Sequence, residues 1–266
     1  MASLLPRLPA RLARSADPAR RMLQLKFELR SRLASAPFAA PLFRPYIWWA
    51  QYKMRDHIDP RECRVDRTTA FVLDGFQGSG NSFATVAFKS CQTTPVRLAH
   101  HLHAPAQIIQ AVRWDIPTLV TLRSPADAVV SLVSRWPYLT LNQGLRAYVR
   151  FYDALIPYLD GLVVTPFLMT IRHLDEVFRA VNRRFNTSFD VFDHTPEQVR
   201  RIRAKTFLPP DEEAKRNAVK AALASELDSG RFDAVLHEAT RVYEIVGQHA
   251  LRPRAERLSS KGPGPQ

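Results

Sequence analysis

The sequence predicts an α/β fold in three layers, with a parallel β-sheet of about four or five strands flanked by helices, plus a helical N-terminal extension. The first observation behind this prediction is a series of short apolar runs between residues 68 and 166. The second is that a segment of helical composition follows each run. Strands that alternate with helices form parallel sheets, and they are continuously apolar because helices cover both faces. A chain of 266 residues can bury a core of this size.

Four segments have the composition of buried strands, and helical composition fills the stretches between them. The strand segments are TTAFVLDG at 68–75, VRLAHHL at 96–102, PTLVTLR at 117–123 and LVVTP at 162–166. Helices are expected over 81–91, 106–112, 126–134, 145–159, 172–185 and most of 211–246. Pro125 suits a helix start, because proline lacks only a donor that the first turn does not use. Ligands bind beyond the carboxyl ends of parallel strands, so the residues that follow 73, 101 and 122 are the first candidates for a site.

The chain carries a net charge of +13, which indicates a partner with negative charge: nucleic acid, an anionic membrane or a small polyanion. Residues 1–35 hold eight basic and two acidic side chains. This arm suits a solvated segment or a helix that contacts a membrane or a partner, and nucleic acid is the least favoured partner. The two cysteines, Cys63 and Cys91, form neither a disulfide framework nor a zinc-binding CxxC pair. A reducing, cytoplasmic compartment is expected, with peripheral membrane contact through residues 1–55 left open.

The composition divides the chain into three parts: a basic, helical extension at 1–66, the α/β domain at 67–250 and a disordered tail at 251–266. Inside the extension, residues 19–33 are expected to form a helix. Its apolar stripe is expected to pack on the core and consists of Met22, Leu25, Leu29 and Leu33. The patch PFAAPLFRPYIWWAQY follows, and it suits either a bilayer interface or a helix folded onto the core. No apolar run reaches the roughly 18 residues of a membrane-spanning helix.

The loop after the first predicted strand reads GFQGSGNSF and begins at Gly75. Together with Gly80 and Ser82, that glycine matches the phosphate-loop template GxxxxGK[ST] at every fixed place except the lysine, where Asn81 stands. Glycines let the backbone N–H groups of such a loop point inward, and the helix N-terminus adds its positive end. The alternative is a plain turn. The strand before the loop and the helix after it favour a phosphate-binding loop in a P-loop-type fold.

A second basic anchor follows the strand PTLVTLR, which ends in Arg123. Ser131 comes eight residues later, about two turns along the next helix at 3.6 residues per turn. A lone arginine in this place often forms a salt bridge. Beside a phosphate loop and a serine hydroxyl, its guanidinium suits a second phosphate group.

These motifs together resemble those of sulfotransferases that use 3′-phosphoadenosine 5′-phosphosulfate (PAPS). That family has a Gly/Ser loop followed by an aromatic residue, here SGNSF at 79–83, and then an Arg-x-Pro with a serine eight residues after the arginine. It also places a His-x-Pro between the two motifs, which here is His103 to Pro105. The resemblance covers residues 68–190 and implies a sulfotransferase-like P-loop domain over 67–250.

Carried over, the resemblance gives each motif a role. His103 would be the catalytic base that takes the proton from a hydroxyl or amino acceptor. Arg123 and Ser131 would bind the 3′-phosphate, and Phe83 would stack on or near the adenine. The 5′-phosphate would contact Gln77, Gly78, Ser79, Gly80, Asn81 and Ser82. The donor is then PAPS, the product 3′-phosphoadenosine 5′-phosphate (PAP), the acceptor a small molecule, glycan or lipid, and no metal is needed.

One residue departs from the family pattern, because Gly78 stands where the family has lysine or arginine. A nearby cation would have to replace that side chain: His101, His100, Lys89 or a residue of the N-terminal arm. Alternatively, the protein is a non-catalytic nucleotide-binding scaffold, peripheral to a membrane. A third hypothesis, a P-loop kinase or NTPase, is disfavoured because Asn81 replaces the lysine and no aspartate ends the strand at 117–123.

The histidines at 100, 101 and 103 also raise the question of a metal site. On a strand, His101 and His103 would share one face. No carboxylate lies near them in the sequence, so a metal is not expected.

Overall fold

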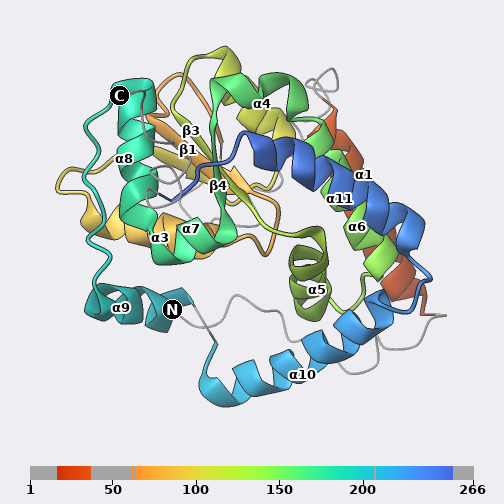
Figure 1. Ribbon diagram of the computed structural model, residues 1–266. Helices are drawn as coiled ribbons and strands as arrows, with labels where there is room; N and C mark the ends of the chain where they lie inside the picture. Colours follow the sequence, from red (N-terminus) through yellow and green to blue (C-terminus); the bar gives the residue numbers. More distant parts are fainter. Residues whose placement is uncertain (1–16, 37–61, 63, 207, 254–266) are drawn as a thin grey trace, which may run out of the picture.

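A four-stranded, all-parallel sheet with the strand order β2-β1-β3-β4 forms the centre of the protein, as a computed structural model shows (Figure 1). The structure describes residues 17–36, 62, 64–206 and 208–253. The strands are β1 (Phe71–Gly75), β2 (Leu98–His100), β3 (Thr118–Leu122) and β4 (Val163–Pro166). An α/β fold with a parallel sheet of four strands flanked by helices is therefore confirmed.

The register brings the carboxyl ends of the three first strands to one edge of the sheet. Gly75 at the end of β1 pairs with Thr121 near the end of β3. Leu73 of β1 pairs with His100, the last residue of β2. All these pairs are parallel, so the loops that follow β1, β2 and β3 leave the sheet side by side.

Helices flank the sheet, with α3, α7 and α8 on one side and α4, α6 and α11 on the other (Figure 1). The long helix α10 extends along the bottom of the view, where it packs on α5. The helices are α1 (Pro18–Ser35), α3 (Asn81–Cys91), α4 (Pro105–Arg113), α5 (Pro125–Arg135), α6 (Leu141–Asp153), α7 (Phe167–Arg172), α8 (Leu174–Phe185), α9 (Pro196–Thr206), α10 (Pro210–Leu227) and α11 (Asp233–Gln248). A 3₁₀ helix covers Ile156–Gly161.

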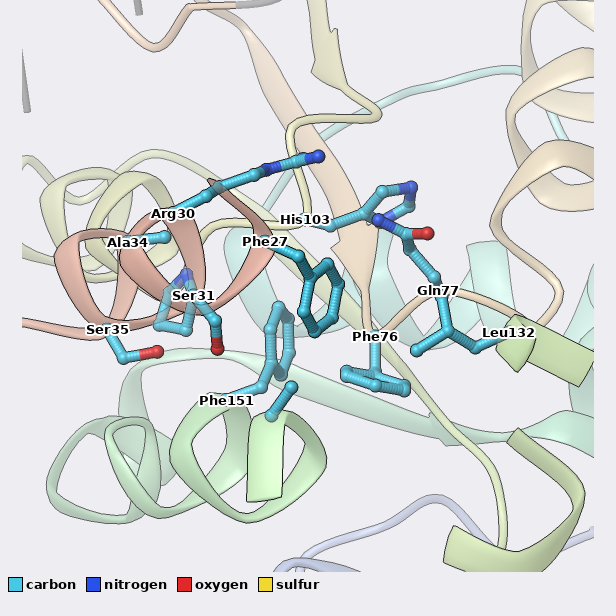
Figure 2. A pocket seen from close by; sticks show the side chains of 12 residues that line it. Phe27, Arg30, Ser31, Ala34, Ser35, Phe76, Gln77, His103, Leu132 and Phe151 are labelled. Atoms are coloured by element: carbon cyan, nitrogen blue, oxygen red, sulfur yellow. The ribbon is translucent and has the colours of Figure 1, made fainter. Parts of the chain in front are cut away.

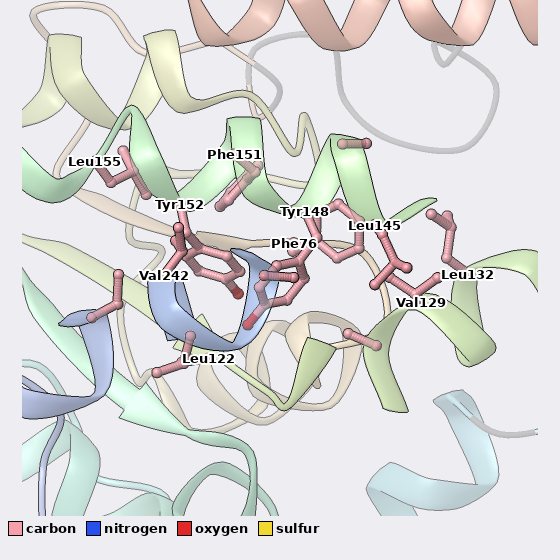
Figure 3. Close-up of a cluster of buried hydrophobic side chains, with 14 of the residues drawn as sticks. Phe76, Leu122, Val129, Leu132, Leu145, Tyr148, Phe151, Tyr152, Leu155 and Val242 are labelled. Carbon is pink, nitrogen blue, oxygen red and sulfur yellow. The ribbon is translucent and has the colours of Figure 1, made fainter. Parts of the chain in front are cut away.

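Two apolar cores lie on the two faces of the sheet, because successive strand residues point to opposite sides. Leu119 of β3 joins the cluster that contains Phe88 and Phe178, whereas its neighbour Val120 joins the cluster around Tyr148 and other residues of α6. Figure 3 shows this second cluster, where aromatic rings of α6 meet side chains of α5 and α11. The continuous apolar strands of the sequence are explained by this burial on both faces.

Most predicted elements lie where the sequence placed them, with shifted ends. The helix expected over 145–159 begins at Leu141, because Thr140 and Gln143 form a capping box at its start. It ends at Asp153, and the 3₁₀ helix follows. The short helix α7 and the polar helix α9 were not expected from the sequence.

The N-terminal helix α1 confirms the helix expected over 19–33, but the face predicted to pack on the core is wrong. Three of its four stripe residues are exposed: Met22 at 53%, Leu25 at 64% and Leu29 at 58%. The core side of α1 carries Phe27 and the buried Ala34 instead. The WW patch and residues 1–16 of the basic arm lie outside the described residues. Among the helices that the structure describes, none is long and apolar enough to cross a membrane.

Candidate functional site

The β1–α3 loop is a tight turn whose shape depends on three glycines. Gly75 faces β3 so closely that a Cβ there would lie 2.2 Å from Oγ1 of Thr121. Gly78 and Gly80 have φ angles of 87° and 96°, in the left-handed region that favours glycine. The glycine pattern of the sequence therefore reflects a backbone that residues with side chains would strain.

Asn81 holds this loop closed from inside. Its side-chain amide donates to the carbonyl oxygens of Gly75 at 3.2 Å and Phe76 at 3.0 Å, and its Oδ1 accepts from Thr121 Oγ1 at 2.6 Å. Only 4% of Asn81 is exposed. The side chain at the place of the template lysine thus braces the loop, and only its backbone N–H is left for a phosphate.

The first turn of α3 supplies the groups that an anion needs. The N–H groups of Asn81, Ser82 and Phe83 have no partner inside the helix, because the first N–H groups of any helix lack a preceding carbonyl. The helix adds the positive end of its dipole at the same place. Gln77 is held by Trp136, whose Nε1 donates to its Oε1 at 3.2 Å. The contact with Trp136 therefore fixes the start of the segment from Gln77 to Ser82.

Arg123 leaves the end of β3 and lies against the same loop. Its Nη1 donates to the carbonyl oxygen of Gly78 at 3.0 Å, and its guanidinium lies 4.1 Å from the ring centre of Phe167. Tyr148 fixes the backbone, since its hydroxyl donates to the Arg123 carbonyl at 2.7 Å. The nearest carboxylate, Asp127, is 3.8 Å from Nε and exposed. The structure thus brings together the two motifs that the sequence places about 45 residues apart.

Ser131 of α5 packs closely against Gly78. A Cβ on Gly78 would lie 3.1 Å from both Cβ and Oγ of Ser131, and 3.0 Å from the carbonyl oxygen of Ala128. A lysine or arginine at residue 78 would meet these atoms and would also have a positive φ. The absence of a basic side chain there is therefore built into the packing of α5 on the loop.

Further cations near this loop belong to α10, and they were not predicted from the sequence. Arg216 donates to the Ser131 carbonyl and to Ser134 Oγ, both at 3.2 Å. Burial lowers the pKa of Lys220, and the positive charges of Arg216 and Arg123 lower it further. Helix α10 looks like a solvated polar helix in sequence, so only its packing on α5 shows that two of its cations face the site.

These cations are poorly neutralised. Burial is the main cause that lowers the pKa of Arg123 and of Arg216, and single carboxylates, Asp127 and Glu213, oppose it. Like charges held together without full compensation are costly, and they are found where an anion binds. We therefore describe Arg123, Arg216 and Lys220 as the cation cluster.

His103 follows β2 and is held by a buried carboxylate. Its backbone N–H donates to Asp74 Oδ2 at 2.7 Å, while Nδ1 lies 2.7 Å from the Gly75 carbonyl oxygen and 3.0 Å from Asp74 Oδ1. Both neighbours of Nδ1 are acceptors, so Nδ1 carries a hydrogen and Nε2 of the neutral ring keeps its lone pair. This is the orientation that a general base needs.

Asp74 stays ionised at neutral pH in its buried place at the end of β1. Burial by itself raises its pKa, but the interaction with His103 and the hydrogen bonds from His103 and the Gly75 N–H outweigh that effect, so the pKa lies below its usual value. Asp74 was not among the site residues predicted from the sequence. The available signal was a single carboxylate in the otherwise apolar run TTAFVLDG.

The cations suggested to replace a basic residue at Gly78 do not fit that role. Burial lowers the pKa of His101 to about 3, so its ring is neutral at pH 7 and its Nε2 pairs with Ser82 Oγ at 3.2 Å. Lys89 lies at the far end of α3 and forms an ion pair with Glu62 at 2.6 Å. Glu62 also contacts Nε2 of His100 at 3.3 Å. The cation that lies on the loop is Arg123.

One other expectation for this region is changed by the structure. Strand β2 ends at His100, and His101 and His103 have φ angles of 63° and 49°, so they do not share a strand face. Among the described residues, no group of three or more His, Cys, Asp or Glu side chains could hold a metal. Phe83 is 4% exposed and packs near Phe192. Its stacking on adenine stays a prediction.

Among the predicted residues, the segment from Gln77 to Ser82, His103, Arg123 and Ser131 meets at one edge of the sheet. The arrangement offers backbone donors and guanidinium groups for an anion, with an oriented imidazole beside them. Comparison with protein families, curated proteins and solved structures found no match to this chain.

Proposed function

We propose that the protein is a PAPS-dependent sulfotransferase with a P-loop-type domain over residues 67–250. The observation that carries the proposal is the contact of Arg123 with the β1–α3 loop, where the guanidinium donates to Gly78 at 3.0 Å. A nucleotide with phosphates at both 5′ and 3′ positions needs two anion sites close together. The loop with the N-terminus of α3 suits the 5′ side, and Arg123 with Ser131 suits the 3′-phosphate.

The cation cluster supports a ligand with several negative charges. Arg216 and Lys220 add to Arg123 on the side of the loop that faces α5 and α10. An anion bound there would relieve the repulsion between them, and PAPS or PAP carries enough charge to do so. This cluster favours a small polyanion rather than nucleic acid as the partner of the domain.

His103 would remove the proton of the acceptor. In the proposed step the acceptor oxygen or nitrogen attacks the sulfur of PAPS, the bond from sulfur to the bridging oxygen breaks, and PAP leaves. The acceptor proton passes to Nε2 of His103, while Asp74 stabilises the resulting imidazolium through Nδ1–H. Charge spread over the sulfuryl oxygens would be stabilised by fixed donors of the loop.

A second candidate is a non-catalytic nucleotide-binding protein of the same fold. It is favoured by Gly78, because a basic side chain there would normally steady the departing phosphate, and the positive φ of residue 78 and the close packing of Ser131 disfavour one. A P-loop NTPase remains the weaker hypothesis, since the Asn81 side chain is turned inward and Arg123 ends β3.

Calorimetric titration with PAP tests the ligand class. We expect the wild-type protein to bind PAP and to bind ATP with Mg²⁺ far more weakly. Arg123→Ala should weaken PAP binding by about tenfold to a hundredfold, the effect of losing one or two charge-assisted hydrogen bonds. Arg241→Ala, an exposed arginine of α11, is the matched control and should change nothing. Equal PAP affinity in both variants would remove Arg123 from the site.

Turnover then separates an enzyme from a scaffold. With radiolabelled PAPS and a panel of hydroxyl and amino acceptors, His103→Ala should lower the rate by a factor of about 100 or more while PAP affinity stays unchanged. A wild-type protein that binds PAP tightly and transfers no label to any acceptor would support the scaffold. A fully active His103→Ala would show that another group takes the proton.

A further inference from the structure

A small cavity lies on the side of His103 that faces the N-terminal helix (Figure 2). Its volume is about 30 Å³. Phe27 of α1, Phe76 of the loop and Phe151 of α6 form apolar walls, while Gln77 and His103 lie beyond these rings in the view. The cavity therefore joins the imidazole that is oriented as a base to an aromatic compartment.

Helix α1 is the outer wall of this cavity, and it packs on α6 and α4. Among its 18 residues only Ala34 is fully buried. Polar contacts do most of the attachment: Arg150 donates to Glu28 at 2.9 Å and to Ser31 Oγ at 3.1 Å, and Arg30 donates to the Leu102 carbonyl at 3.0 Å. Because water can replace these polar partners and only one residue of α1 is fully buried, the helix can shift outward without unfolding of the sheet.

We propose that this cavity is the acceptor site, that α1 is its movable wall, and that the acceptor is an apolar hydroxyl compound such as a phenol or a chain alcohol. The proposal rests on the proposed sulfotransferase activity. The lining surface is mostly apolar and offers a ring or an alkyl chain a dry surface. The polar groups beside it, which belong to Arg30, Ser31 and Ser35, would still leave several hydroxyls of a sugar without partners. The single hydroxyl would point to Nε2 of His103, which takes its proton.

The size of the cavity requires the movement of α1. A volume of about 30 Å³ is close to the share of one water molecule in the liquid, so a phenol does not fit until the wall moves outward. Such a wall would also close over the bound acceptor and keep water from the sulfuryl group. Phe27 is the residue of α1 that determines the space beside His103.

The test measures binding of 1-naphthol by its fluorescence, with and without saturating PAP. We expect the wild-type protein to bind 1-naphthol and not glucose. Phe27→Trp, which fills the cavity, should weaken naphthol binding at least tenfold and leave PAP affinity unchanged. Leu25→Trp, the same change on the exposed face of the same helix, should affect neither ligand. Phe27→Ala should also change naphthol affinity. It replaces Phe27→Trp in the test if that variant fails to fold.

The outcomes separate this inference from the activity on which it rests. Absence of naphthol binding to the wild-type protein, or equal naphthol affinity in the wild type and both Phe27 variants, overturns the acceptor site. Binding of glucose in place of naphthol overturns the acceptor class. Failure of PAP to bind overturns the proposed function instead, while naphthol binding that depends on Phe27 would still support an apolar site under α1.

Discussion

The β1–α3 loop and the helix α1 lie on two sides of His103, and they are built in opposite ways. The loop is braced by Asn81 from inside and packed against Thr121 so closely that only glycine fits at residue 75. Helix α1 has one buried residue and is held by polar contacts. The anion side of the site is therefore formed in advance, whereas the side that we assign to the acceptor can adapt.

The largest expected effect comes from a substitution in the rigid β1–α3 loop. Gly75→Ala places a methyl group 2.2 Å from Thr121 Oγ1 and 2.6 Å from the Thr121 carbonyl oxygen. Because backbone must move to relieve this overlap, the free energy of unfolding should fall by about 3 kcal/mol. Urea denaturation followed by circular dichroism measures the change.

Gly247→Ala in α11 is the matched control, since the nearest atom to a Cβ there is 4.0 Å away. The same substitution in an open helical place should stabilise the protein by about 0.5–1 kcal/mol. Two glycines with the same effect would show that the close approach of β1 and β3 is not rigid.

The second prediction concerns pH and the histidine that pairs with Ser82. The folded pKa of His101, about 3, lies below its ordinary value of 6.5, so the unfolded chain binds the proton more readily. Stability is therefore complete above pH 6.5 and falls as the pH drops from 6.5 toward 3. From pH 6.5 to 5 this group should remove about 2 kcal/mol at most, at 1.36 kcal/mol per unit.

His101→Asn should flatten this pH dependence, and asparagine tolerates the left-handed backbone at residue 101. Denaturation midpoints of both proteins at several pH values test it. The contribution of Asp74 is separate, because its lowered pKa matters only near and below its usual value of 3.8. If the two proteins lose stability in parallel between pH 6.5 and 5, His101 is protonated in the folded state.

The third prediction concerns the ion pair that attaches α1 to α6. Glu28→Gln removes the ion pair with Arg150 while a hydrogen bond can remain, so global stability should fall by no more than about 1 kcal/mol. Hydrogen exchange should become faster in α1 and stay unchanged in β1, because α1 can open alone.

Glu226→Gln removes an ion pair with Arg231 between exposed side chains far from α1 in the sequence, and it is the control. It should leave exchange in α1 unchanged. Faster exchange in both α1 and β1 of Glu28→Gln would show that α1 unfolds only with the sheet, and the proposed movable wall would then lose its physical basis.

The sequence predicted the parts of the site that local patterns determine. Apolar runs located the strands, and parallel strands send their carboxyl ends to one edge, so the meeting of Arg123 with the glycine-rich loop could be expected. The alternation of glycines likewise indicated a tight loop. These features depend on residues close in sequence or on a general property of parallel sheets.

What the sequence could not show depends on packing between distant segments. Asn81 stands in a lysine's place, but its inward direction follows from Thr121, 40 residues away. Asp74 and His103 meet because β1 pairs with β2. Arg216 faces the site because α10 packs on α5. Each contact joins elements whose relative placement no local pattern encodes.

The smallest expected effect concerns the outer face of α1, where sequence pattern and structure disagree. A stripe at helical spacing usually marks a buried face, yet Met22, Leu25 and Leu29 are more than half exposed. Replacing all three by glutamine, a good helix former, should change the free energy of unfolding by no more than about 0.5 kcal/mol. Phe27→Gln on the inner face of the same helix should cost more than about 1 kcal/mol, because its ring packs on the core around α6. Denaturant titrations of the two variants compare the faces directly.

The opposite result is a triple variant that loses several kcal/mol while Phe27→Gln is near neutral. It would mean that the stripe packs as its spacing suggests and that α1 presents its other face to solvent. The cavity beside His103 would then lack its outer wall.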